Sequence, residues 1–270
     1  MFLDSSFIFD SSYFQNPWLI AVGLNTFLLG IGLIAPKKLL TPAGLLHSWM
    51  LGVILWGSLG WQGYLVVLFY FIVGSAVTRI GMAQKEALGI AEKRSGARGP
   101  ENVWGSALTG TLCALGILLV NVFNLETRWI TYLLLLGFVA SFSTKLSDTC
   151  ASEVGKAYGK RTFLITTLQP VSRGTEGAVS LEGTLAGVLG SAAIALVSWG
   201  VGLINLLGVF FCLLAAFIAT NLESVIGATL QAKVGWLTNE VVNILNTLIG
   251  AISAVLLALA WYWFHQQTTW

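Results

Sequence analysis

Eight long apolar segments constrain what this chain can fold into, because each is close to the roughly 20 residues that a helix needs to cross a membrane. Only 10% of the 270 residues are charged, against about 25% in a typical soluble domain. Segments of this length favour helices over barrel strands. We therefore expect an all-α polytopic membrane protein of about eight transmembrane helices, formed by residues 1–270 as a single domain. The approximate spans are Pro17–Ala35, Ala43–Trp61, Tyr64–Ala83, Asn102–Val122, Trp129–Leu146, Leu181–Trp199, Leu203–Leu222 and Val241–Phe264.

The cysteines and the N-terminal residues narrow the class of protein further. Cys113, Cys150 and Cys212 are scattered and have no CxxC spacing, so we expect neither a disulfide framework nor a zinc site. The first residues contain neither a basic n-region nor an Arg- and Ser-rich transit segment. This pattern favours a prokaryotic membrane protein, or a mature form without its targeting segment.

The distribution of Lys and Arg predicts the orientation of the spans. With eight spans, the loops after the first, third, fifth and seventh share one side of the membrane. That side, with the span ends entering it, holds thirteen of the fourteen Lys and Arg residues, all except Arg128. The positive-inside bias makes this side cytoplasmic and both termini non-cytoplasmic. A site on this side has access to nucleotides and Mg²⁺.

Five of the predicted spans carry polar or small residues at helical spacing only near their inner ends. Residues three and four apart share a helix face, and charges facing lipid are costly, so we expect these stripes to converge on one wet cavity. Small residues such as Gly183 and Gly187 more often serve helix packing. The apolar outer halves, such as 133–137 and 256–260, suit a lipid tail. The stripes are Ser75, Thr78, Arg79 and Met82; Asn102, Ser106 and Thr109; Ser141, Thr144, Lys145 and Asp148; Ser180, Gly183, Thr184, Gly187 and Ser191; and Asn239, Asn243 and Asn246.

The segment 141–180 interrupts the apolar pattern with carboxylates, cations and glycines. Carboxylates can hold a divalent metal, and cations can hold phosphate. The run around Lys156 and Lys160 lacks the residue spacing of a P-loop, so we reject a P-loop in this chain. Asp148 and Glu153 are five residues apart, about 140° around a helix. They either form structural ion pairs with neighbouring lysines, or share one metal if the helix ends or bends just after Asp148.

The run Asp148-Thr-Cys-Ala-Ser-Glu-Val-Gly-Lys156 resembles the phytyl-phosphate kinase family, a former domain-of-unknown-function family of integral membrane proteins. The resemblance covers most of the chain, from the second to the eighth predicted span. Cys150 fills a variable position, and Glu176 stands where other members often have Asn. The family is distantly similar to dolichol kinases and membrane cytidylyltransferases. Further matching runs are 85–93, 98–103, 164–167, 174–180 with Gly183, and 223–227.

This resemblance implies an enzyme that transfers the γ-phosphate of CTP, or of another nucleoside triphosphate, to phytyl phosphate. The product, phytyl diphosphate, is a precursor of tocopherol and related prenyl lipids. The implied cofactor is Mg²⁺ or Mn²⁺, and the implied partners are nucleotide and lipid but no nucleic acid. The expected location is an inner or thylakoid membrane of cyanobacterial type, with the site facing the cytoplasm. The alternatives are another CTP-dependent lipid kinase, a cytidylyltransferase, or a membrane transporter.

Phosphoryl transfer needs alignment and charge neutralisation more than covalent chemistry, and the candidate residues are assigned on that basis. The predicted catalytic residues are Asp148, Glu153, Lys156 and Glu176. The predicted metal ligands are Asp148, Glu153 and Glu223. The predicted nucleotide- and phosphate-binding residues are Arg79, Lys85, Arg98, Asn102, Lys145, Lys160, Arg161, Arg173, Gly174, Thr175, Gly177 and Ser180.

Overall fold

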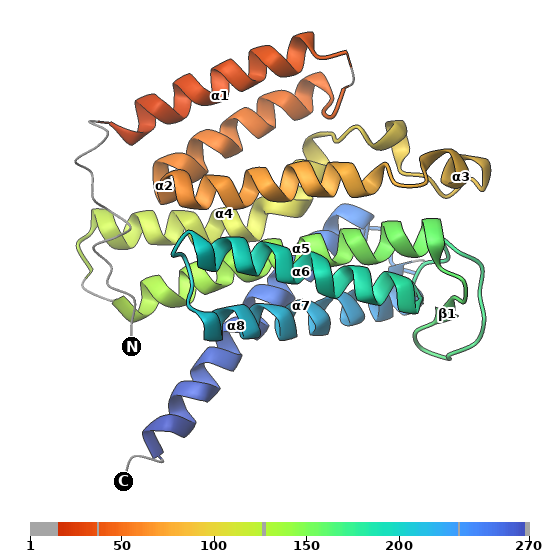
Figure 1. The fold of residues 1–270 in the computed structure, drawn as a ribbon. Coiled ribbons are helices and arrows are strands. Elements are labelled where there is room, and N and C mark those ends of the chain that lie inside the picture. The colour runs from red at the N-terminus through yellow and green to blue at the C-terminus, as the bar shows by residue number, and fades with distance from the viewer. Residues whose placement is uncertain (1–15, 37, 126–127, 232, 268–270) are drawn as a thin grey trace.

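The chain forms a bundle of long helices, as predicted for an all-α protein (Figure 1). The computed structural model describes residues 16–36, 38–125, 128–231 and 233–267. Its only strands in these ranges are the short antiparallel pair β1 (Phe163–Leu164) and β2 (Ala178–Val179). The helices are α1 (Pro17–Ile34), α2 (Pro42–Thr78), α3 (Met82–Ala87), α4 (Pro100–Val122), α5 (Arg128–Tyr158), α6 (Leu181–Gly200), α7 (Leu206–Ile226) and α8 (Asn239–Gln267), with short helical turns η3 (Lys93–Gly96) and η4 (Gly227–Gln231).

Seven helices among the described residues are long and apolar enough to cross a membrane, one fewer than predicted. The difference lies in α2, whose 37 residues contain the second predicted span and most of the third. Its backbone is non-helical at Gly60, with φ 66° and ψ −162°, a conformation that glycine adopts without steric cost. The two arms of α2 fold back at this bend (Figure 1). The bend thus lies just before the two residues, 62 and 63, that separate the second predicted span from the third.

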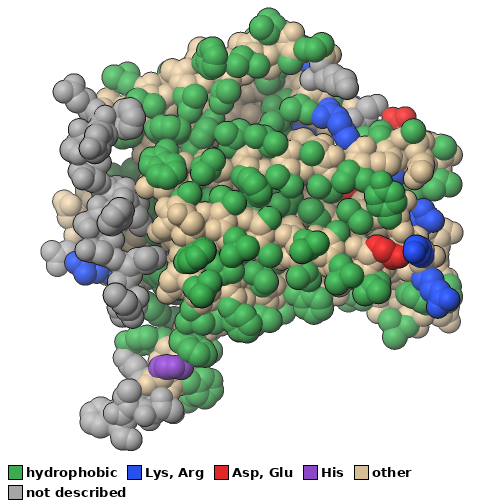
Figure 2. All heavy atoms as spheres, in the orientation of Figure 1, with side chains coloured by type: hydrophobic (Ala, Val, Ile, Leu, Met, Phe, Trp, Pro, Cys, Tyr) green, Lys and Arg blue, Asp and Glu red, His purple; other side chains and the backbone are tan. Residues whose placement is uncertain are grey.

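The connections between the helices segregate to two ends of the bundle. One end, here called the polar end, holds α3, the loop with β1 and β2, and the start of α8, whereas the bend at Gly60 and the α6–α7 connection lie at the other (Figure 1). On the face in Figure 2, the acidic side chains lie only at the polar end, and apolar side chains cover the helices. This arrangement agrees with the prediction that polar residues gather near one end of the spans.

Helix α5 is the centre of the bundle. It contacts α2, α4, α6, α7 and α8, and every residue from Leu135 to Cys150 is buried. The predicted span ended at Leu146, but the helix continues to Tyr158. The region 133–137, predicted to face a lipid tail, instead contributes Leu135 and Leu136 to the packed core.

Glycines on α6 bring it close to α5, which confirms the predicted packing role of Gly183 and Gly187. A methyl group added at Gly183 would lie 2.6 Å from the carbonyl oxygen of Ala151, and one at Gly187 would lie 3.1 Å from that of Ser147. Small residues at such positions let the backbones of two membrane helices approach closely. This contact sets the position of the N-terminal end of α6 beside the polar part of α5.

We predict that Gly183→Ala destabilises the protein by roughly 1–3 kcal/mol, because the added methyl group overpacks a backbone contact. The measurement is the apparent melting temperature in detergent. Gly200→Ala on the same helix is the control, because a methyl group there meets no atom within 4 Å. Equal melting temperatures for the two variants would contradict the close contact.

Candidate functional site

A cavity of about 750 Å³ opens at the polar end of the bundle. All five predicted polar stripes contribute to its lining, as expected from their spacing. Not every stripe residue reaches it: Ser75, Thr144 and Asn246 are buried between helices instead. The stripe residues that line the cavity are Thr78, Asn102, Ser106, Lys145, Asp148, Ser180, Gly183, Thr184, Gly187, Ser191, Asn239 and Asn243.

Most of the residues predicted for the site line this cavity, although they come from five separate parts of the chain. They lie on the loop before α4, on α4, α5 and α7, and on the loop before α6. Those that line it are Arg98, Asn102, Lys145, Asp148, Glu153, Lys156, Gly174, Thr175, Glu176, Gly177, Ser180 and Glu223.

Five predicted phosphate-binding cations do not line the cavity: Arg79, Lys85, Lys160, Arg161 and Arg173. Arg79 donates to the Lys38 carbonyl oxygen at 3.3 Å, and Arg173 donates to that of Ala157 at 3.2 Å. Lys160 and Arg161 are exposed just after α5 ends. The sequence placed these cations at the correct end of the molecule, but their side chains do not line the cavity.

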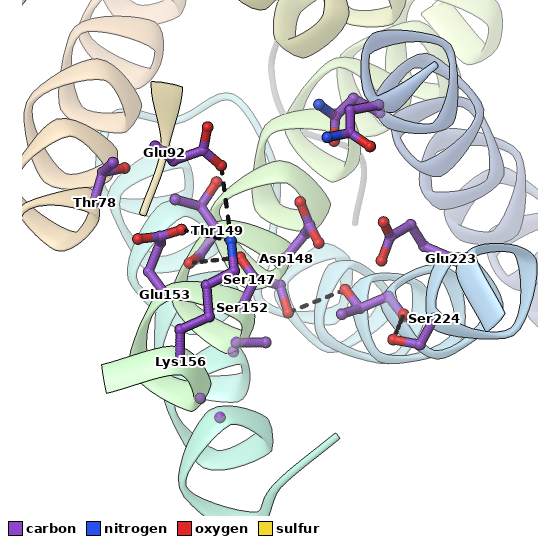
Figure 3. Close-up of a pocket in the computed structure, with 18 of the residues that line it drawn as sticks. Thr78, Glu92, Ser147, Asp148, Thr149, Ser152, Glu153, Lys156, Glu223 and Ser224 are labelled. Carbon is purple, nitrogen blue, oxygen red and sulfur yellow. Dashed lines mark hydrogen bonds and ion pairs between the residues drawn. The ribbon is translucent and has the colours of Figure 1, made fainter. Parts of the chain in front are cut away.

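Lys85 is fully buried and makes a structural ion pair instead of facing a ligand. Its ammonium group donates to the Glu153 carboxylate and, at 2.7 Å, to the carbonyl oxygen of Thr78. Glu153 also accepts from Lys156 at 3.3 Å, and the Lys156 ammonium lies 3.9 Å from Glu92 (Figure 3). These ion pairs hold α3 and the following loop against α5.

A second charged group lies deeper in the cavity, around Asp148. The Lys145 ammonium donates to Asp148 at 2.5 Å and to the Asn243 side-chain oxygen at 2.6 Å. Glu223 comes from α7 and lies beside Asp148 (Figure 3). Neighbouring carboxylates favour a cation between them, and Lys145 supplies only one positive charge. Mg²⁺ usually takes one or two carboxylates together with substrate phosphates, so Asp148 and Glu223 fit such an ion.

The three carboxylates predicted to share one metal do not form one group. Helix α5 continues unbroken past Asp148, so the condition under which Asp148 and Glu153 would share a metal is not met. Glu153 lies toward Lys156 and Glu92, away from Glu223 (Figure 3). Within the described residues, no set of three or more His, Cys, Asp or Glu side chains could hold a metal ion. Glu153 is therefore reassigned to the ion pair with Lys85.

The loop from Gly174 to Ser180 brings backbone groups to the cavity. Gly174 and Gly177 have φ of 80° and 75°, and pairing of β1 with β2 closes the loop. Ser180 caps α6 by accepting from the backbone nitrogen of Gly183 at 3.1 Å. Because free backbone N–H groups and the helix dipole favour anions at a helix N-terminus, this edge of the cavity suits phosphate.

The cavity residues that the predicted site omitted include Arg94, Tyr70 and Asn243. Arg94 donates to Glu101 and, at 3.0 Å, to Asn102. Arg98 donates to the Tyr70 hydroxyl at 2.9 Å, and its guanidinium carbon lies 5.2 Å from the Tyr70 ring centroid. The cation-rich loop 84–101 indicates Arg94 as part of either a phosphate clamp or a solvated face. No sequence signal distinguishes Tyr70 from other aromatic residues of its span, and Asn243 was noted only as one of the stripe residues.

Comparison with known proteins identifies relatives over most of the chain. Residues 25–251 match the family described as "Integral membrane protein DUF92". The chain is 70% identical over 239 residues to "Uncharacterized membrane protein sll0875" of Synechocystis sp., covering 88% of this chain and 90% of the relative. It is 45% identical over 240 residues to "Protein VTE6, chloroplastic" of Arabidopsis thaliana, covering 88% and 70%. It is 35% identical over 226 residues to "Uncharacterized membrane protein MJ0933" of Methanocaldococcus jannaschii, covering 83% and 88%. No solved structure matches.

We predict that Glu153→Gln destabilises the protein by about 3–5 kcal/mol, because it leaves the Lys85 ammonium buried without a countercharge. The double variant Lys85→Met with Glu153→Leu should recover most of this loss, since apolar replacements of a buried pair are often tolerated. Thermal unfolding in detergent measures both effects. Arg94→Gln, in an exposed pair with Glu101, is the control and should change stability by less than about 1 kcal/mol.

Proposed function

The chain belongs to the integral membrane protein family DUF92, the former domain-of-unknown-function family that its motifs resemble, and from this premise we propose that it is a membrane-embedded prenyl-phosphate kinase. The enzyme transfers the γ-phosphate of CTP, or of another nucleoside triphosphate, to phytyl phosphate. Its product, phytyl diphosphate, serves tocopherol and prenyl-lipid synthesis. The proposed location is a cyanobacterial-type inner or thylakoid membrane, with the polar end on the cytoplasmic side, where nucleotides are available.

The observation that carries this proposal is the composition of one cavity. Carboxylates on α5 and α7, cations before α4 and on α5, and the N-terminus of α6 all face the same space of about 750 Å³. Phosphoryl transfer depends on alignment and charge neutralisation, which such a set of groups supplies. The volume lies within the range of sites for small molecules and cofactors, about 300–1,000 Å³.

Each part of the cavity has a proposed role. Asp148 and Glu223 would hold Mg²⁺ or Mn²⁺, which neutralises charge on the nucleotide phosphates when bound. Lys156 and the loop 174–180, which includes Glu176, bind and orient the polyphosphate. Arg98 binds the acceptor phosphate. Because the acceptor is already an anion, the reaction needs no strong general base, and none is assigned.

Two other classes remain as alternatives to be tested. A cytidylyltransferase would use the same nucleotide and a similar lipid. A transporter is less favoured, because transporters place binding groups near the membrane midplane, whereas the polar lining here is confined to one end of the bundle.

We predict that purified protein with Mg²⁺ and γ-labelled CTP transfers the label to phytyl phosphate. A cytidylyltransferase would instead release the label as pyrophosphate, and a transporter would leave it on CTP. The measurement is chromatographic separation of labelled lipid, pyrophosphate and nucleotide, with a panel of prenyl alcohols as alternative acceptors. Label in pyrophosphate alone, or in no product, would overturn the kinase.

We also predict that Asp148→Asn lowers the turnover rate by about 100-fold or more, because it removes a charge that stabilises the transferring phosphate through the metal. Glu182→Gln on the first turn of α6 is the matched control, since this carboxylate does not line the cavity, and it should retain activity. Turnover is compared at a temperature at which both variants are folded, because Asp148→Asn also removes the ion-pair partner of the buried Lys145 ammonium and lowers stability. A fully active Asp148→Asn variant would remove Asp148 from the site.

A further inference from the structure

A second cavity lies beside the first and differs from it in chemistry. It has a volume of about 300 Å³ and is lined by α1, both arms of α2, α4 and Phe142 of α5. Its walls are mainly aliphatic and aromatic, with residues such as Leu29, Leu45, Val67 and Phe71. This composition suits a hydrocarbon chain rather than a nucleotide.

The two cavities meet at four shared residues: Tyr70, Arg98, Asn102 and Ser106. Within the described part of the chain, Arg98 forms no ion pair with a carboxylate, and its side chain donates to the Tyr70 hydroxyl oxygen. Its backbone is fixed by bonds with Leu39 and Thr41 in the α1–α2 connection. Arg98 is therefore held at the junction of the polar cavity and the apolar cavity.

The apolar cavity is deep along the helix axes. Its lining runs from Ala35, the C-cap of α1, back along the helix to Asn25, which is about 15 Å at the helical rise per residue. That depth is about half of a hydrocarbon core roughly 30 Å thick. At the deep end the Tyr64 hydroxyl donates to the Asn25 side-chain oxygen at 2.9 Å. Both residues line the pocket, and a polar pair is an unfavourable contact for an apolar chain.

We propose that this second cavity is the binding site for the prenyl tail of the acceptor, with the acceptor phosphate at Arg98 and the tail directed toward Asn25 and Tyr64. The inference rests on the proposed kinase function and adds the substrate's position. It replaces the sequence-based expectation that the tail lies along 133–137 or 256–260. Asn25 and Tyr64 lie at its deep end, so the pocket is expected to discriminate acceptors by chain length.

The test uses a substitution that narrows the apolar cavity and changes no residue that lines the polar cavity. Ser48 lines the apolar cavity on the first arm of α2, so Ser48→Trp should fill part of it. Leu46→Trp is the matched control, because Leu46 is on the same helix but 53% exposed on its outer surface. Initial rates are measured with phytyl phosphate and with a five-carbon prenyl phosphate.

Ser48→Trp should lower the ratio of long-chain to short-chain activity by at least about tenfold, the size of effect expected when a hydrophobic pocket loses room for carbon groups. Leu46→Trp should leave the ratio unchanged. Arg98→Gln should weaken both acceptors and leave the ratio unchanged, since both carry the same phosphate. Equal loss on both acceptors in Ser48→Trp, or no loss, would overturn the tail site.

A binding measurement separates failure of this inference from failure of the kinase. Phytyl phosphate should raise the apparent melting temperature of the wild type and of Leu46→Trp, but not that of Ser48→Trp. Wild-type protein that transfers phosphate to no acceptor overturns the kinase, while the melting temperatures still decide the cavity. An equal shift in all three proteins shows that the lipid binds elsewhere and overturns the proposed site.

Discussion

Charged side chains on a buried membrane helix must find partners, and the structure at the polar end follows from this requirement. Helix α5 carries Lys145, Asp148, Glu153 and Lys156 on its last turns, and three of them are almost fully buried. Lys145 pairs with Asp148 on the same helix and reaches α8 through Asn243. Glu153 reaches back to Lys85 on α3. The ion pairs therefore tie sequence-distant segments to one helix, and the space left between these segments is the polar cavity.

The polar cavity and the apolar cavity provide different environments for the two parts of a lipid phosphate. A phosphate group needs cations and hydrogen-bond donors, whereas a prenyl tail needs to be kept from water. The polar cavity offers the first environment, and the pocket between α1, α2 and α4 offers the second. Arg98 lies at their junction with its guanidinium beside the Tyr70 ring. In the proposed kinase, this arrangement brings an acceptor from the membrane to a nucleotide from the aqueous side.

Glycine residues have different structural roles in the regions that form the two cavities. On α6 it removes the side chain that would hold α6 away from α5, as at Gly183. In α2 it permits the positive φ at Gly60 that folds one helix into two arms, and these arms form much of the apolar pocket. At Gly174 and Gly177 the same freedom shapes the loop that lines the polar cavity. The close approach of α6 to α5 and the reversal of direction within α2 thus both depend on glycine.

The sequence by itself determined the approximate limits of the apolar segments, the polar end, and many of the residues that line the cavity. These features are local: helix length follows from apolar runs, and residues such as Lys145 and Asp148 share a face by their spacing. Tertiary structure decided that Lys85 neutralises Glu153, that α5 continues past Asp148, and that Glu223 rather than Glu153 lies beside Asp148. It also decided that Arg98 meets Tyr70 at the mouth of an apolar pocket. These contacts join residues far apart in the chain, and which partners meet depends on how the helices pack, which no local pattern encodes.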